Sequence, residues 1–432
     1  LFSGTLVAPR GLPMLAALVR NALGGGGLVQ KDTANTALAL HGGRLLALME
    51  QSKPSRLEVT RGGAVRTLEA GCDLGGAIPE APVTGGALSA HSRVDPNTGD
   101  LVSVSYSTAL PPFIRHDVFS PDGALRMSTG VDVPNPVMVH DLAITQDHTV
   151  ILDFPMTVRV ERTLLDRFPV EYEPEAGARI GLAPRNKPPE DGAGAGDGVR
   201  WVSVSPCVVL HTVNAHEEVD PLTGLGSGKV RLQALRSIPG GPQSFICEYT
   251  PAFLYEWVLD FERGVLLAEG YLSDVPVEFP ALNPRFHGSA AARWCYAITP
   301  SSAGGPLEHY ATPEQGILID GLVKLDLTTG AAAARFTLPQ GRHVVSEPTF
   351  VAREGGSGGE DDGYLLLVTS AVTAAAGGTG AAKRRRVSNG STLLVFDART
   401  IGEGPVAELP LPADLPYGLH SFFVPWGDLT DE

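Results

Sequence analysis

The chain has 432 residues, and its 43% hydrophobic and 19% charged content is that of a globular protein, which excludes an intrinsically disordered chain. The 33 basic and 48 acidic residues give a net charge of −15, so no nucleic-acid partner is expected. No apolar run approaches the roughly 20 residues that a membrane-spanning helix needs.

Cysteines are few and widely separated, and none forms a CxxC pair, which argues against a disulfide framework and against a thiolate zinc site. The chain begins at Leu1 without an initiator methionine or a secretory signal, so we expect it to be an excerpt of a longer protein. Nothing in the sequence indicates an oligomeric state.

The first predicted element is a helix over Gly11–Leu23. Leu12, Leu15 and Val19 recur at helical spacing, and four consecutive glycines end the pattern. Such an apolar stripe usually packs on the body of the protein. Its short length and single charge also suit a helix that lies in a membrane interface, and both interpretations stay open.

Short β-like stretches dominate the rest of the chain, and many are joined by turns that begin with Asp or Ser-Pro-Asp and end on Gly. The predicted turns are Asp95–Gly99, Ser120–Gly123, Asp220–Gly224, Asp260–Gly264, Asp326–Gly330 and Asp397–Gly402. Repeated hairpins without intervening helices favour one all-β domain over residues 1–432, a β-propeller of small antiparallel sheets. A stack of β-sandwiches is the alternative, but no linker divides the chain.

Three segments have compositions that cannot form a packed core, and we interpret them as surface-loop insertions. They are residues 186–198, 354–363 and 371–391.

Four of the 11 histidines stand at predicted strand ends in unusual contexts: His91, His140, His211 and His420. Their spacings of 49, 71 and 209 residues match no local metal-binding motif, so each alone is more often a hydrogen-bonded structural histidine. A propeller changes this judgement, because it brings inner-strand residues of distant blades to one axis.

Seven segments occur in an order that resembles the carotenoid cleavage oxygenase family, plant and algal members in particular. They are AHSRVDPNTGDL, VHDLAITQDHTVILDFPM, LHTVNAHEE, LYEWVLDFERG, VEFPALNPRF, SEPTFVAR with EDDGYLLLVT, and LPYGLHSFFVPW. The resemblance covers about residues 29–426. It implies a seven-bladed β-propeller whose helices cap one face above a substrate tunnel, with the first blade incomplete in this chain.

Matched motif by motif, the resemblance implies a non-haem Fe(II) bound by His91, His140, His211 and His420, and no organic cofactor. It further implies that Glu50, Glu278 and Glu347 accept hydrogen bonds from three of these rings. Such carboxylates orient a metal-bound imidazole and raise its basicity. Without the resemblance, the three would be ordinary exposed or salt-bridged carboxylates.

The implied activity is cleavage of a C=C double bond of a carotenoid or apocarotenoid by O2 into two carbonyl products. Candidates for the tunnel lining are Phe113, Phe245, Trp257 and Phe279, each of which could equally be core. Cleavage of a stilbenoid by the same chemistry is disfavoured, because stilbene-cleaving members tend to carry Lys where this chain has Met49. An enzyme similar to the retinoid isomerohydrolases and a non-catalytic interaction platform are the remaining alternatives.

The resemblance also favours membrane contact for the Gly11–Leu23 helix, since the matching helix of plant and algal members is thought to dip into the membrane. A peripheral membrane protein of the plastid is therefore the expected location, with the cytoplasm as the alternative.

Overall fold

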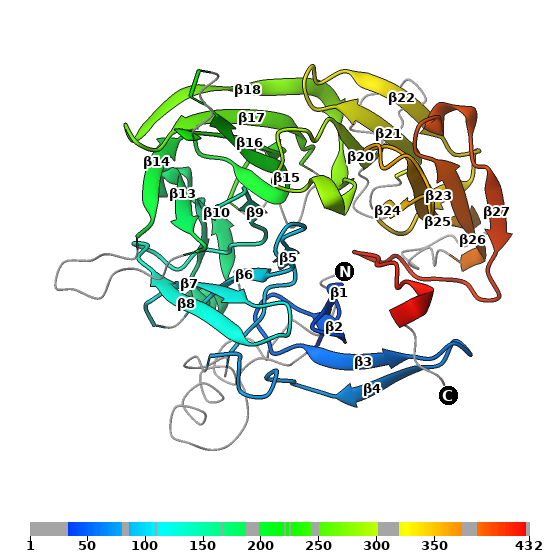
Figure 1. Ribbon diagram of the computed structural model, residues 1–432, viewed down its shortest axis with the longest axis horizontal. Coiled ribbons are helices and arrows are strands. Elements are labelled where there is room, and N and C mark those ends of the chain that lie inside the picture. The colour runs from blue at the N-terminus through cyan, green and yellow to red at the C-terminus, as the bar shows by residue number, and fades with distance from the viewer. Residues whose placement is uncertain are drawn as a thin grey trace.

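Antiparallel sheets arranged around a common centre form the molecule (Figure 1). The computed structural model describes residues 33–79, 86–108, 110–165, 167–186, 198–219, 222–223, 226–242, 250–300, 319–373 and 387–428. Six sheets of four or five strands are the blades of a β-propeller, in which the first strands of the blades face the centre and the last strands form the rim.

The first three blades follow one another along the chain. Blade one contains β1 (Ala37–His41), β2 (Arg44–Leu48), β3 (Ser55–Val59) and β4 (Val65–Glu69). Blade two contains β5 (Arg93–Val94), β6 (Leu101–Tyr106), β7 (Ile114–Phe119) and β8 (Leu125–Val131). Blade three contains β9 (Ala143–Ile144), β10 (His148–Asp153), β13 (Ala178–Pro184) and β14 (Arg200–Val204). Between β10 and β13, the chain forms a separate two-stranded sheet of β11 (Met156–Val158) and β12 (Val170–Tyr172).

The last three blades complete the arc. Blade four contains β15 (Val208–Val219), β16 (Gly226–Ser237), β17 (Phe253–Asp260) and β18 (Val265–Pro276). Blade five contains β19 (Glu278–Ala281), β20 (Trp294–Thr299), β21 (Gly321–Asp326) and β22 (Ala332–Thr337). Blade six contains β23 (Arg342–Val344), β24 (Thr349–Ala352), β25 (Gly363–Thr373), β26 (Val387–Asp397) and β27 (Ala407–Pro410).

The predicted turns join neighbouring strands of one blade wherever the structure describes them. Asp326 is typical: its carboxylate accepts from the backbone N–H of Thr328 at 2.8 Å, and its carbonyl accepts from Gly330 at 2.7 Å. Gly330 has φ +73°, the left-handed conformation that glycine adopts without strain. The hairpin prediction is thus confirmed for these turns; Asp220–Gly224 lies largely outside the described residues.

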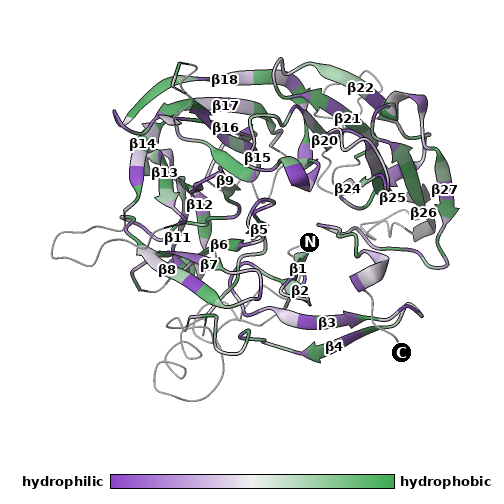
Figure 2. Cartoon of the chain, in the orientation of Figure 1, coloured by the Kyte–Doolittle hydropathy of each residue, from purple (hydrophilic) through white to green (hydrophobic). Residues whose placement is uncertain are grey.

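The hydrophobic core is divided among the interfaces between consecutive blades. One cluster, for example, packs Val150 and Ile180 of blade three against Leu232 and Trp257 of blade four. Comparable clusters lie at each of the other four interfaces from blade one to blade six, and Figure 2 shows hydrophobic residues along the packed strands. Each sheet is therefore buried by its neighbours rather than by helices.

The β-propeller prediction is confirmed, but with six blades in the described part of the chain, not seven. In Figure 1 the C-terminal segment, residues 411–428, lies between the outer strand β27 of blade six and the strand β3 of blade one. Pro412, Pro416 and Pro425 interrupt this segment, and proline has no N–H with which to extend a strand ladder.

The predicted helical cap is also absent from the described residues, whose helices are all short 3₁₀ turns: η1 (Val160–Leu165), η2 (Pro174–Ala176), η3 (Pro284–Phe286), η5 (Ile401–Glu403) and η6 (Trp426–Asp428). The predicted helix Gly11–Leu23 lies outside the described residues. In the part of the chain that the structure describes, no helix is long and apolar enough to cross a membrane.

The predicted loops have different outcomes. Residues 354–363 form a mostly exposed connection between β24 and β25. The boundaries 371–391 were too wide, since β25 continues to Thr373 and β26 begins at Val387, where both strands gain ladder hydrogen bonds. Residues 187–197 and 374–386 are not described.

Two glycines test the turn geometry. A Cβ built on Gly330 would overlap the carbonyl oxygen of Leu272, whereas one on Gly264 (φ +66°) meets nothing within 4 Å. We expect Gly264→Ala to lower the free energy of unfolding by about 1–2 kcal/mol, the cost of a left-handed non-glycine residue. Gly330→Ala should cost more, because backbone must move as well. Urea unfolding of both variants measures the difference, and equal losses would contradict the described turn.

Candidate metal centre

Four imidazole rings from distant parts of the chain meet at the centre of the propeller. His91 and His140 precede the inner strands β5 and β9, His211 lies within β15, and His420 lies in the C-terminal segment. The ring centroid of His91 is 4.3 Å from that of His140, 5.3 Å from that of His211 and 4.6 Å from that of His420. All four predicted histidines therefore belong to one cluster.

The ring nitrogens are close enough to share one cation. Ligand atoms of His91, His140 and His211 all lie within 4.8 Å of one another, and the Nε2 atoms of His91 and His420 are 2.9 Å apart. His91 is 8% and His211 5% exposed, so water has little access to these nitrogens. Nε2 of His211 is buried without a hydrogen-bond partner in the described residues, as an atom reserved for a ligand would be.

Three of the rings contact a carboxylate through Nδ1. Glu278 accepts from His211 at 2.6 Å and Glu347 from His420 at 2.8 Å, and Glu50 contacts Nδ1 of His140. A carboxylate that accepts from Nδ1–H leaves the lone pair on Nε2, which faces the cluster. The three predicted glutamates are thus where ring orientation requires them.

Irregular strands aim two of these side chains. The ladder between β15 and β16 shifts register on both sides of Thr212, so His211 lies in a β-bulge. The ladder between β19 and β20 shifts between Glu278 and Ala281, where Phe279 has φ +55° and its N–H donates to the Glu278 carboxylate at 3.0 Å. A bulge redirects the side chains of its strand. Residues other than glycine that adopt the strained left-handed conformation are found mainly at functional sites.

Burial and charge determine the protonation of the cluster. Burial, followed by the neighbouring His140, His420 and His211, lowers the pKa of His91 well below its ordinary value, so this ring is neutral near pH 7. Burial of His140 also favours its neutral form, but the carboxylates of Glu50, Asp141 and Glu278 together outweigh burial and raise its pKa. Burial opposes ionisation of Glu278, yet His211 outweighs it and the pKa of Glu278 is lowered.

The donor set fits a transition metal. Neutral imidazoles suit iron, zinc, copper and nickel, whereas Mg²⁺ and Ca²⁺ prefer oxygen ligands. Four nitrogens converge here, and the carboxylates lie behind the rings on their Nδ1 side. The residues can therefore hold such an ion.

Some residues of the site carried no signal of their own in the sequence. The hydroxyl of Tyr106, at the end of β6, donates to Glu50 at 3.0 Å, and burial followed by Glu50 raises its pKa well above the ordinary value. Asp141, directly after His140, bonds to the segments that carry His91 and His211. Only the adjacency of Asp141 to a candidate ligand could have drawn attention to it.

The predicted tunnel residues differ in position. The ring of Phe279 lies 5.1 Å from that of His211 and 5.3 Å from that of His420, at the edge of the cluster. Phe113 packs against the core between blades two and three. Trp257 is wrong as a lining residue, because it is fully buried in the core between blades three and four and so borders no accessible space. Phe245 lies outside the described residues.

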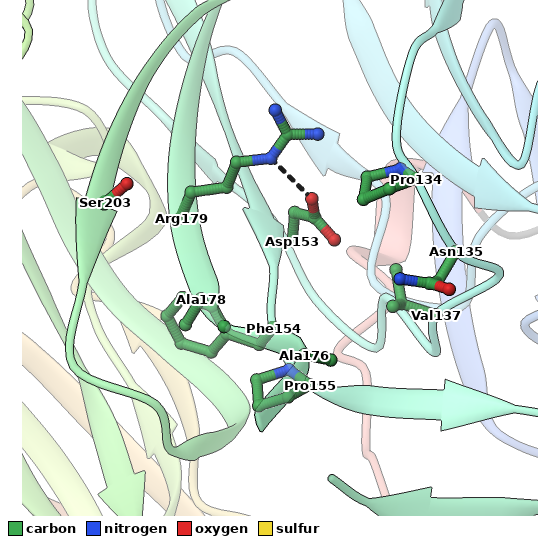
Figure 3. A pocket seen from close by; sticks show the side chains of 11 residues that line it. Pro134, Asn135, Val137, Asp153, Phe154, Pro155, Ala176, Ala178, Arg179 and Ser203 are labelled. Carbon is green, nitrogen blue, oxygen red and sulfur yellow. Dashed lines mark hydrogen bonds and ion pairs between the residues drawn. The ribbon is translucent and has the colours of Figure 1, made fainter. Parts of the chain in front are cut away.

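A separate pocket of about 250 Å³ shares no residue with the histidine cluster. Figure 3 shows its lining, in which the side chains of Asp153 and Arg179 point toward each other. Nε of Arg179 donates to the Asp153 carboxylate at 2.7 Å, so the charged groups of the pocket satisfy each other.

Comparison with known proteins agrees with this geometry. The family model described as RPE65, retinal pigment epithelial membrane protein, matches residues 15–425. The chain is 29% identical to carotenoid 9,10(9',10')-cleavage dioxygenase 1 of Phaseolus vulgaris, over 93% of this chain and 68% of that protein. It is 27% identical to the carotenoid cleavage oxygenase of Mycobacterium tuberculosis, over 90% of this chain and 77% of the relative.

Solved structures share the fold. The lignostilbene dioxygenase of Pseudomonas brassicacearum superposes with a TM-score of 0.71 at 25% identity, over 93% of this chain and 81% of that one. A cobalt-substituted apocarotenoid oxygenase of Synechocystis superposes with a TM-score of 0.67 at 25% identity, over 90% and 74% of the two chains.

The contribution of the Glu347 carboxylate to metal binding by His420 can be tested with Co²⁺ as a probe. We expect Glu347→Gln to weaken Co²⁺ binding by about 10- to 100-fold, because the neutral amide no longer raises the basicity of His420. Glu217→Gln is the matched control, since Glu217 accepts from Nδ1 of His148 at 2.9 Å in a similar pair away from the cluster. Calorimetric titration gives both affinities; equal affinity for the Glu347 variant and the unmodified protein would contradict the role of that carboxylate.

Proposed function

The chain belongs to the RPE65 and carotenoid cleavage oxygenase family, and we propose that it is an Fe(II)-dependent dioxygenase that cleaves one C=C double bond of a carotenoid or apocarotenoid. The observation that carries the proposal is the cluster of four imidazoles at the propeller centre, three of them backed by carboxylates. Carotenoid cleavage by the relatives of similar sequence supports the substrate class.

His91, His140, His211 and His420 would hold the iron. When bound, Fe(II) would activate O2 for scission of the double bond, in which the two oxygen atoms end in two carbonyl products. The neutral imidazoles leave the ion with its full double positive charge, unlike the two-histidine, one-carboxylate site of many other oxygenases. The three glutamates would keep Nδ1 of His140, His211 and His420 protonated and Nε2 of these rings available.

The protein would supply position and exclude water. The burial of His91 and His211 limits solvent at the reacting atoms, and the Phe279 ring beside His211 and His420 offers an apolar face for a polyene. Phe113 and Phe245 remain candidates for the more distant lining. The depth to which the polyene enters would then select the double bond.

A stilbenoid is the second candidate substrate, favoured by the fold shared with a lignostilbene dioxygenase. Met49 stands where stilbene-cleaving members tend to carry Lys, and its sulfur accepts from the N–H of Gln51 at 3.2 Å. A thioether cannot pair with a phenolate as an ammonium does. The carotenoid is therefore the preferred class.

Product analysis tests the proposal. The Fe(II)-loaded protein, incubated with a panel of carotenoids, apocarotenoids and stilbenes, should give two carbonyl products by mass spectrometry, and only when O2 is present. His140→Ala should lose both iron and turnover, while His148→Gln, in the control pair, should keep both. Retained iron and turnover in the His140 variant would overturn the assignment. Turnover of a retinoid ester without O2 would indicate an isomerohydrolase instead.

We also propose peripheral membrane contact through Gly11–Leu23 and a plastid location. A chloroplastic protein of Arabidopsis thaliana, described as a probable carotenoid cleavage dioxygenase 4, is 27% identical to this chain. A substrate as apolar as a carotenoid resides in membranes, and Leu12, Leu15 and Val19 form the apolar stripe of the segment.

Replacing Leu15 by Glu should reduce cosedimentation with carotenoid-containing liposomes several-fold, because a charge in the apolar stripe opposes insertion. Exposed Leu222→Glu, at a turn of blade four, is the control and should leave sedimentation unchanged. Unchanged binding of the Leu15 variant would return the segment to packing on the protein body.

A further inference from the structure

One buried carboxylate, that of Asp141, connects three segments of the candidate metal centre. Its Oδ1 accepts from the N–H of Leu142 at 2.7 Å. Its Oδ2 accepts from the N–H of Thr212 at 2.8 Å and from Nη2 of Arg93 at 2.8 Å. The Thr212 hydroxyl lies 3.0 Å from the same oxygen and 2.8 Å from the carbonyl of Leu142, with one proton to donate between them. The Asp141 side chain has no exposed surface.

Each partner of Asp141 lies next to a histidine of the cluster. Arg93 follows His91 by two residues, and Thr212 follows His211 directly, while Asp141 itself follows His140. These segments are 48 and 71 residues apart from Asp141 along the chain. No strand ladder joins β5 to β9 or to β15, so the carboxylate supplies a polar link that the sheets do not.

Of the four histidines in the cluster, His91 depends most on such a link. It is the one histidine of the four whose Nδ1 contacts no carboxylate in the described residues, and that atom is buried without a partner. Its main chain is held locally, since its N–H donates to the Ser89 hydroxyl at 3.2 Å. The Arg93–Asp141 ion pair, at 2.8 Å, is the contact that ties this turn to the segment of His140.

We propose that Asp141 is a positioning residue for the metal centre, which sets the spacing of His91, His140 and His211 through Arg93 and Thr212. This inference rests on the proposed function, because it takes the four histidines as metal ligands. Asp141 touches neither the ion nor the substrate in this role. It acts through the backbone on which the ligands stand.

The isosteric change Asp141→Asn is informative because only donors surround the carboxylate. The NH2 of an Asn must face either the N–H of Leu142 or the donors of Thr212 and Arg93, and its neutral oxygen binds the guanidinium more weakly. The segments then lose their common anchor with almost no change in volume. We expect the Kd for Co²⁺ to rise by about 10- to 100-fold, the range seen for partners that orient ligands.

The experiment is a Co²⁺ titration of the full chain, followed by calorimetry and by visible absorption of the bound ion, which responds to ligand geometry. Asp141→Asn should show both the weaker Kd and an altered spectrum. Asp117→Asn is the matched control: Asp117 is equally buried and pairs with Nε of Arg115 at 2.9 Å, and its own partners, Arg115 and Ser128, both lie on strands of blade two. The control should lower thermal stability while it leaves Kd and spectrum unchanged.

A second variant keeps the test decisive if Asp141→Asn does not fold. Thr212→Val removes one hydroxyl in a side chain of the same shape, and it should shift the Co²⁺ spectrum and weaken Kd less than the Asn variant. If Asp141→Asn, or Thr212→Val when only that variant folds, has the Kd and spectrum of the unsubstituted protein, the positioning role is overturned while the metal centre still stands. An unmodified protein that binds no Co²⁺ would overturn the metal centre and the positioning role together.

Discussion

Nitrogens that face one another at the propeller centre limit how the segments that carry the four histidines can be arranged. Nε2 of His91 and Nε2 of His420 lie 2.9 Å apart in a site with little water. Two lone pairs at that distance repel unless a proton or a cation lies between them. Since Glu278 and Glu347 accept from Nδ1 of their rings, those rings direct their lone pairs inward as well. One shared metal ion would satisfy all of these lone pairs at once.

The blades provide the rigidity that such an arrangement needs. Apolar clusters fix each blade against the next from blade one to blade six, so the inner strands hold His91, His140 and His211 at defined angles. No comparable cluster of described residues joins blade six to blade one. His420 comes from the C-terminal segment in that interval, where Glu347 binds its ring and accepts from the N–H of Ser421 at 2.8 Å. Polar contacts of Glu347 thus hold the C-terminal segment at the centre, in the interval where no apolar cluster of described residues joins two blades.

Much of this could be predicted from the sequence, but by different routes. Turns such as Asp326–Gly330 follow from local chemistry, and the four histidines follow from a series of family motifs, since spacings of 49 to 209 residues carry no local signal. The number of blades could not be predicted, because each blade is built from strands close together in the chain and a strand pattern does not determine how many such sheets surround the centre. Trp257 was misassigned because a strand pattern does not reveal which face meets a neighbouring blade. Asp141 was missed because its partners become neighbours only in the folded chain.

The four histidines differ in how many contacts hold them. His140 and His211 have both a carboxylate on the ring and a link to the Asp141 carboxylate, so their positions are fixed twice. The ring of His91 has no carboxylate partner in the described residues and its segment is linked through Arg93, whereas the ring of His420 has Glu347 but no link to Asp141. The two singly held rings are also the pair whose Nε2 atoms approach each other at 2.9 Å. A cation shared by these two rings would therefore stabilise the pair that the protein itself holds by the fewest contacts.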